Sequence, residues 1–270
     1  MIRHDQTVCE LNHRLRVVAG PCRSGTTAIG NGFSQHPKVE AYYQSVKTGL
    51  RDGEGECHKL FFQPAGKPAS KKFLVDKETF GPHTPAESAF RLFPNDEAIV
   101  ATRPIFLYRD PVSTWNSWME QGWTRYDLFE LAYVSVFQTY RYAQQVAGHA
   151  VSCMTYETLV DQPLKTMRAM CSHWRIPFDE SLVQWKTKFQ PNTSMRGGKD
   201  FLKSKDDGSF RAVEESTTIR RLDRPLVIST ADIEKIQSGP LWAMYKTIQR
   251  EGFGFVGAKR SRDNAAESPP

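Results

Sequence analysis

The chain has 270 residues, of which 39% are hydrophobic and 24% charged. This composition is typical of a folded globular protein and excludes disorder throughout, and no run of residues approaches the ~18 uninterrupted apolar residues of a membrane-spanning helix. Lys and Arg outnumber Asp and Glu by 36 to 30, a net charge of +6, which favours an anionic ligand without choosing among nucleic acid, a membrane surface and a small phosphorylated molecule.

Five short apolar runs in chain order are typical of buried strands: residues 15–20, 39–43, 73–76, 104–108 and 151–156. Helical patterns lie between and after these runs: residues 24–36, a helix opening at Asp110-Pro111, and residues 124–147, 157–173 and 231–251. The regular alternation predicts an α/β fold, in which helices cover both faces of a parallel sheet.

The remaining segments are polar and carry no regular periodicity. We expect residues 1–14 to be a lead-in, and residues 45–72 and 191–230 to be mostly loops. Residues 1–256 are predicted to form one domain, and residues 257–270 a disordered tail. We find no internal repeat.

The cysteine pattern and the amino-terminal segment predict a cytoplasmic protein. There are five cysteines, spaced widely and without a CxxC pair, so neither a disulfide framework nor a zinc site is indicated. The first residues are polar and lack the apolar segment of a signal peptide. We therefore expect a reducing compartment and no bound metal.

The most informative segment directly follows the first predicted strand. Residues 20–27 read Gly-Pro-Cys-Arg-Ser-Gly-Thr-Thr, which has the spacing of a phosphate-binding loop, where backbone N–H groups and a helix N-terminus surround an anion. The lysine of nucleotide triphosphatases is replaced by Thr26, and the cation is instead Arg23, whose guanidinium suits one phosphate held in a bidentate fork. A plain strand-turn-helix junction is the alternative interpretation.

This loop resembles the 5′-phosphosulfate loop of sulfotransferases that use 3′-phosphoadenosine 5′-phosphosulfate (PAPS). The resemblance implies a P-loop-like α/β fold. It also implies that the cofactor is bound by Arg23, Ser24, Gly25, Thr26 and Thr27.

A second match lies about ninety residues further along the chain. Arg109 ends the apolar run Pro104–Tyr108, and Ser117 follows about two helical turns after the Asp110 cap, so that both could contact one phosphate. Alone, the pattern would be read as a helix start with a solvated arginine. Together with the first loop it is similar to the motif in which sulfotransferases hold the 3′-phosphate of PAPS.

Two weaker matches complete the resemblance. The segment that begins at Tyr156-Glu157 is similar to a family segment that would place Tyr156 near the adenine, although a tyrosine at a strand end is also an ordinary core residue. Arg196 and Gly197 lie where the family carries a basic loop to the 3′-phosphate, and a solvated charged loop is the alternative.

Sulfuryl transfer needs charge relief on the leaving phosphate and a base for the acceptor proton. Arg23, with Thr26, Thr27 and the loop amides, is placed for the first task. Lys77, which follows the third apolar run, could neutralise charge on the transferring sulfuryl group, and it is similar to the lysine that many sulfotransferases carry at this point. Asp76 is our first candidate for the base, followed by Glu78 and His58. His36 and His83 adjoin prolines and are interpreted as turn residues.

The sequence thus predicts a PAPS-dependent sulfotransferase that acts on a hydroxyl, or less favourably an amine, of a small molecule or carbohydrate. A P-loop kinase for a small acceptor is the alternative enzyme, and a nucleotide- or RNA-binding module the non-enzymatic one. The sequence lacks the basic patch interleaved with aromatic residues that a nucleic-acid-binding module would show. No motif in the sequence indicates the acceptor or the oligomeric state. Trp115, Trp118 and Trp123 could line an acceptor pocket, but core packing is favoured.

Overall fold

The computed structural model describes residues 9–64, 71–190, 194–197, 210–221 and 225–252. Its centre is a six-stranded sheet in which every neighbouring pair is parallel, in the order β7-β6-β2-β5-β3-β8. The strands are β2 (Leu15–Pro21), β3 (Val39–Tyr43), β5 (Phe73–Phe80), β6 (Ile105–Tyr108), β7 (Ser152–Thr155) and β8 (Arg196–Gly197). The predicted parallel sheet is therefore confirmed, with β2 at a point where the chain order turns from one side of the sheet to the other.

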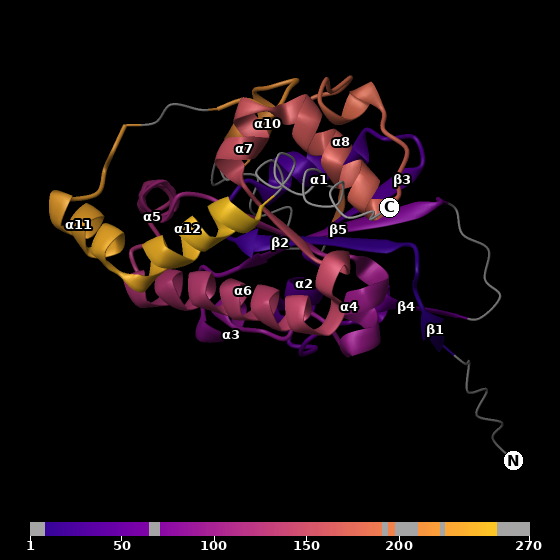
Figure 1. Cartoon of the computed structure of the whole chain (residues 1–270), viewed down its shortest axis with the longest axis horizontal. Helices are drawn as coiled ribbons and strands as arrows, with labels where there is room; N and C mark the ends of the chain where they lie inside the picture. Colours follow the sequence, from indigo (N-terminus) through magenta and orange to yellow (C-terminus); the bar gives the residue numbers. More distant parts are fainter. Residues whose placement is uncertain (1–8, 65–70, 191–193, 198–209, 222–224, 253–270) are drawn as a thin grey trace, which may run out of the picture.

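Helices cover both faces of this sheet (Figure 1). One face carries α1 (Thr26–Ser34), α7 (Tyr156–Asp161), α8 (Pro163–Trp174) and α10 (Arg211–Glu214). The other carries α2 (Ser45–Arg51), α3 (Pro85–Ser88), α4 (Asp96–Thr102) and the long α6 (Tyr126–Ala147). The carboxy-terminal part adds α5 (Pro111–Glu120), α11 (Thr230–Ser238) and α12 (Pro240–Glu251), of which α12 contacts β7 and α6. Among the described helices, none is both long and apolar enough to cross a bilayer.

Two apolar cores follow from this layering, one on each face of the sheet. Trp115 and Trp118 are buried in the core on the α6 face, as favoured from the sequence, whereas Trp123 lines the main cavity. The indole Nε1 of Trp118 donates a hydrogen bond of 2.9 Å to the carbonyl of Cys22. Core packing thus supports the loop that follows β2.

Several element boundaries differ from those predicted. The segments 157–173 and 231–251 are each two helices, because Pro163 and Pro240 begin a new helix where the preceding one ends. Residues 45–51 form α2 and not a loop. The predicted lead-in contains a short strand, β1 (Cys9–Leu11), which pairs antiparallel with β4 (Phe62–Pro64).

The most consequential difference concerns β5, which continues through Asp76, Lys77, Glu78 and Thr79 to Phe80. This polar stretch reads as the end of a strand, since buried strands of parallel sheets are normally apolar. All eight residues of β5 are nevertheless buried. Lys77 therefore lies inside a central strand and does not follow it.

Candidate active site

A cavity opens at the carboxyl edge of the sheet, beside the ends of β2, β3, β5 and β6. This edge is where ligands bind in open parallel sheets, next to the point at which the strand order reverses. The residues that line the cavity come from the loop after β2, from the strand ends, from α2 and α7, and from the segment around Phe210–Arg220. They include six Lys or Arg side chains, and among the described lining residues there is no Asp or Glu: Arg23, Lys47, Arg51, Lys77, Arg109 and Arg220.

The loop after β2 leads directly into the N-terminus of α1. Arg23 and Gly25 have φ values of 72° and 102°, so the loop turns twice through the left-handed region. At Gly25 a side chain would be strained and would also collide, because its Cβ would lie 2.5 Å from Cδ2 of Tyr156. The first N–H groups of α1 have no partner within the helix, as at any helix N-terminus. They lie beside Thr26 and Thr27, which line the cavity, and a helix N-terminus of this kind is suited to an anion.

Tyr156 connects the two predicted phosphate sites. Its ring packs against Gly25 on one side, while the guanidinium carbon of Arg109 lies 4.9 Å from its ring centroid. Arg23 donates a hydrogen bond of 3.0 Å from Nε to Oγ of Ser117. The structure thus brings Arg23, Arg109 and Tyr156 to one cavity. Ser117 is buried, contacts Arg23 and does not line the cavity. Ser24 is also fully buried and does not line the cavity.

The backbone that carries Arg109 is tied to the rest of the fold by Glu157. Its Oε1 accepts a hydrogen bond of 3.1 Å from the N–H of Asp110, and its Oε2 accepts one of 2.9 Å from the Tyr245 hydroxyl. The carbonyl of Arg109 accepts a hydrogen bond of 3.0 Å from the Tyr133 hydroxyl. These contacts hold the strand end from which the Arg109 side chain extends.

Strand β5 sends its charged side chains to opposite faces, because successive residues of a strand alternate. Lys77 and Thr79 line the cavity. Asp76 and Glu78 lie on the other face, at the first turn of α2. Asp76 accepts hydrogen bonds from the Ser45 hydroxyl and N–H, and Oε1 of Glu78 accepts one of 2.6 Å from the N–H of Val46.

The two carboxyl groups therefore replace a side-chain N-cap, which α2 lacks at Gln44. Negative groups at a helix N-terminus stabilise the helix. Burial raises the pKa of Asp76 and raises that of Glu78 well above its ordinary value. Neither carboxyl group lines the cavity, so the geometry does not place the first two candidate bases beside a substrate.

Lys77 has the opposite shift. Burial lowers its pKa to about 7, and its Nζ lies 3.9 Å from the ring centroid of Tyr43. A lysine of this kind changes its charge readily when an anion binds nearby.

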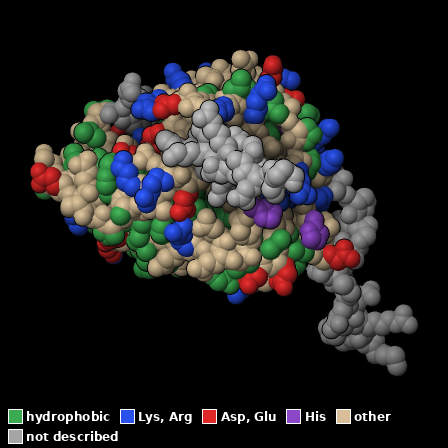
Figure 2. All heavy atoms as spheres, viewed as in Figure 1, with side chains coloured by type: hydrophobic (Ala, Val, Ile, Leu, Met, Phe, Trp, Pro, Cys, Tyr) green, Lys and Arg blue, Asp and Glu red, His purple; other side chains and the backbone are tan. Residues whose placement is uncertain are grey.

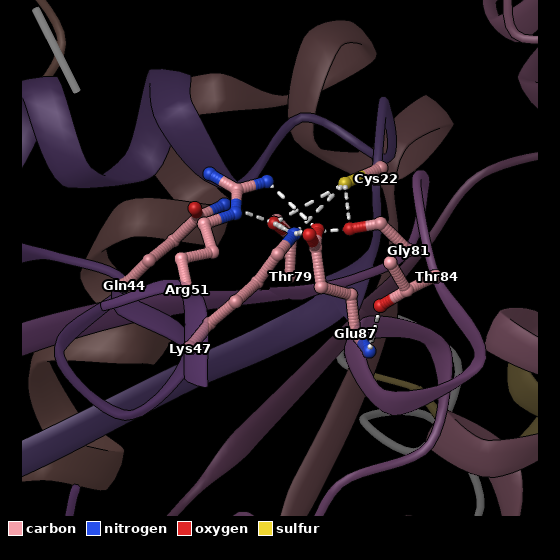
Figure 3. Close-up of polar contacts among 8 residues, drawn as sticks. All are labelled: Cys22, Gln44, Lys47, Arg51, Thr79, Gly81, Thr84 and Glu87. Carbon is pink, nitrogen blue, oxygen red and sulfur yellow. Dashed lines mark hydrogen bonds and ion pairs between the residues drawn. The ribbon is translucent and has the colours of Figure 1, made fainter. Parts of the chain in front are cut away.

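A second cationic cluster lies beyond Lys77 and is formed by residues of α2 (Figure 3). Lys47 is fully buried, donates to the carbonyl of Gly81, and has Nζ 3.5 Å from a carboxylate oxygen of Glu87. Arg51 contacts the same oxygen at 2.8 Å. Two cations thus share one carboxylate.

Cys22 and Thr79 connect this cluster to the phosphate loop. Sγ of Cys22 lies 3.3 Å from Oγ1 of Thr79 and 3.7 Å from Nζ of Lys47. The amide of Gln44 also donates to Oγ1 of Thr79. The cluster is therefore continuous with the loop that begins at Cys22.

Three other predicted residues lie away from the cavity. His58 has Nε2 2.9 Å from the carbonyl of Arg91 and does not line the cavity. Arg196 forms an ion pair of 2.6 Å with Glu40, and β8 pairs with the edge strand β3 at Arg196 and Gly197. Neither of these two residues lines the cavity. The residues that follow, 198–209, are outside the described part.

Several residues that line the cavity belong to no motif in the sequence: Gln44, Lys47, Arg51, His83 and Arg220. Lys47 and Arg51 are four residues apart, which would place them on one face of a helix, but the glycine-rich segment around them concealed that helix. The adjoining proline predicts a turn residue at His83, whereas the structure places this residue at the cavity. Its ring lies 5.7 Å from that of Trp123 at the cavity wall.

The structure also bears on metal binding. The described residues contain no group of three or more His, Cys, Asp or Glu side chains that could hold a metal ion.

The family of the chain follows from its sequence. The model of the sulfotransferase domain family matches residues 16–221, which contain β2, the phosphate loop and every described cavity residue. The chain belongs to this family. No curated protein matches this sulfotransferase.

Solved structures of other sulfotransferases are similar to this one at low identity. A sulfotransferase domain from the curacin biosynthetic pathway has 14% identity and a TM-score of 0.46, over 83% of this chain and 96% of that one. The sulfotransferase domain of the Synechococcus PCC 7002 olefin synthase has 16% identity and a TM-score of 0.47, over 86% and 94%. A mouse sulfotransferase complexed with PAP has 12% identity and a TM-score of 0.42, over 88% and 83%.

The anchoring of α2 yields a testable expectation about Asp76. Replacing Asp76 with Ala leaves the Ser45 hydroxyl and N–H without their acceptor in a buried place, and we expect the free energy of unfolding to fall by about 1–3 kcal/mol. Asp76→Asn keeps an acceptor oxygen and should recover most of that loss. Urea unfolding of the three proteins measures both effects. Equal stability of Asp76→Ala and the unsubstituted protein would contradict the anchoring role.

Proposed function

We propose that this sulfotransferase moves the sulfuryl group of PAPS to a hydroxyl, or less favourably an amine, of a small-molecule or carbohydrate acceptor. One observation supports the donor above all: Arg23, Arg109 and Tyr156 line one cavity, with the Arg109 guanidinium over the Tyr156 ring and Gly25 of the loop after β2 against that ring. PAPS carries a 5′-phosphosulfate and a 3′-phosphate on one ribose, which also carries the aromatic adenine. A guanidinium for each anionic end and a ring beside them match that chemistry.

The phosphate loop would hold the 5′ end of the donor. The N–H groups at the start of α1, with Thr26 and Thr27, would bind the 5′-phosphate, and Arg23 would neutralise the charge that develops on it. Arg109 would bind the 3′-phosphate together with Arg220, which also lines the cavity and whose carbonyl accepts a hydrogen bond of 3.5 Å from the Tyr156 hydroxyl. A kinase acting on ATP is less well supported, because Thr26 occupies the position of the lysine that contacts the outer phosphates of a nucleoside triphosphate.

In the proposed reaction the acceptor oxygen attacks sulfur in line with the leaving phosphate. A new S–O bond forms to the acceptor while the bond between sulfur and the 5′-phosphate oxygen breaks, and adenosine 3′,5′-bisphosphate (PAP) leaves. Lys77 lines the cavity beside this loop. Its protonated form would stabilise the negative charge on the transferring group.

The acceptor must lose a proton as the new bond forms. We propose that His83 accepts this proton. Among the described residues that line the cavity, His83 is the only histidine, and none is Asp or Glu. His83 lies in the segment after β5, which also carries Lys77 into the cavity. Asp76 and Glu78 hold α2 instead, and His58 lies elsewhere.

Binding of PAP tests the donor. We expect PAP to raise the melting temperature of the protein more than ATP does, because ATP lacks the 3′-phosphate. Arg109→Ala should weaken PAP about ten- to a hundredfold, as expected for the loss of a charge-assisted hydrogen bond. Arg125→Ala is the matched control, since Arg125 is exposed and pairs with Asp127. Stabilisation by ATP alone, or unchanged PAP affinity in Arg109→Ala, would contradict the proposal.

The pKa of Lys77 predicts proton uptake on binding. Near pH 8 Lys77 is mostly neutral in the free protein, since its pKa is about 7. The negative charge of PAP stabilises the protonated form and raises this pKa, so about one proton should be taken up. Calorimetry in two buffers of different ionisation enthalpy measures the uptake. Lys77→Met should abolish it, and uptake that persists in this variant would assign the proton to another group.

Substitution of the two histidines tests the base. His83→Asn should lower kcat for sulfuryl transfer from PAPS to a phenolic acceptor by about a hundredfold or more, with little change in PAP affinity. His58→Asn is the control and should leave kcat unchanged. A loss confined to His58→Asn would reverse the assignment.

A further inference from the structure

The cavity has more positive charge than the donor requires. With Arg23 and Lys77 at the phosphosulfate and Arg109 and Arg220 at the 3′-phosphate, two of the six lining cations have no partner on PAPS. Both are on α2, on the β3 side of the phosphate loop, and therefore opposite Tyr156: Lys47 and Arg51.

The structure does not neutralise these two cations completely. Glu87 contacts both, at 3.5 Å from Nζ of Lys47 and 2.8 Å from the Arg51 guanidinium. Burial lowers the pKa of Lys47, so an anion bound here would favour its protonated form, and the one carboxylate would then face a surplus of positive charge. The carboxyl groups of Asp76 and Glu78 offset little of this positive charge, because burial raises their pKa and favours their neutral forms. Both groups also accept hydrogen bonds from the start of α2.

The two cations differ in how they can act on a ligand. The side chain of Lys47 is 0% exposed and that of Arg51 is 16% exposed. Arg51 is therefore the group that a ligand can contact, and Lys47 contacts the same oxygen of Glu87 from a fully buried position. Figure 3 shows Gln44, Lys47 and Arg51 extending from one side toward Thr79.

The same end of the cavity has the surfaces that an acceptor needs. Trp123 and Tyr43 supply aromatic walls, Gln44 supplies an amide, and His83 lies beside Trp123. An acceptor placed here lies next to Lys77 and to Cys22, at the start of the loop after β2. The surplus charge thus lies where the acceptor, and not the nucleotide, would bind.

We propose that the acceptor of this enzyme is itself an anion, and that Arg51 binds its oxyanion group while the hydroxyl to be sulfated lies at His83. This inference rests on the proposed function and specifies the substrate class of the same site. A guanidinium binds carboxylate and sulfonate oxygens through charge-assisted hydrogen bonds. An amine or a neutral alcohol would gain nothing from this charge.

The test uses matched phenols and the full-length protein saturated with PAP. The probes are 4-hydroxybenzoate, its neutral methyl ester, and 4-hydroxybenzenesulfonate, whose affinities are measured by calorimetry. We expect one or both anions to bind about tenfold or more tightly than the ester, and the comparison of the two shows whether a planar carboxylate or a tetrahedral sulfonate is preferred.

Two variants locate the effect. Arg51→Met should remove the preference for the anions, and Lys59→Met, at an exposed lysine outside the cavity, should keep it. Arg51→Met leaves Glu87 paired with Lys47, so its fold should be retained, and unchanged PAP binding verifies this. Arg51→Lys keeps the charge without the fork and should restore part of the preference.

The outcomes separate this inference from the proposed function. Failure of PAP to bind the unsubstituted protein would contradict the donor assignment. If PAP binds, the inference is overturned when the ester binds as tightly as the anions, when none of the three probes binds at millimolar concentration, or when Arg51→Met retains the preference.

Discussion

The structure depends on the burial of charged residues in the central strand β5. Asp76, Lys77, Glu78 and Thr79 pass through the middle of the sheet without contact to bulk water. A buried charge is costly unless a partner compensates for it. Because side chains alternate along a strand, these four residues lie on two faces of the sheet. The carboxyl groups of Asp76 and Glu78 accept hydrogen bonds from the start of α2, and Lys77 and Thr79 face the cavity.

This division couples the fold to the site. By receiving the first turn of α2, the carboxyl groups set where that helix begins, and α2 in turn brings Lys47 and Arg51 to the cavity. Asp76 and Glu78, which the sequence offers as candidate bases, thus position α2 in the structure. The cations that they position belong to a segment with no recognisable motif.

The electrostatics of the cavity follow from the same arrangement. Its described lining carries six basic side chains and no acidic one. The nearby acidic residues do not line the cavity: Asp76 and Glu78 contact the start of α2, and Glu87 contacts Lys47 and Arg51. Burial lowers the pKa of Lys77 to about 7, which is the physical sign of positive groups gathered in a place poor in water. An anionic ligand relieves this cost, so the cavity is suited to anions. The net charge of +6 is less informative than this local placement.

The sequence by itself determined the parallel α/β fold, the loop from Gly20 to Thr27 between β2 and α1, and the position of Arg109 directly after β6. These features are local, because a loop or a strand end is encoded by neighbouring residues. Only the tertiary structure decided which face Asp76 and Glu78 occupy, that Arg23 contacts Ser117, and that α2 lines the cavity. Such contacts join segments far apart in the chain, and the direction of a side chain depends on where its strand lies in the sheet.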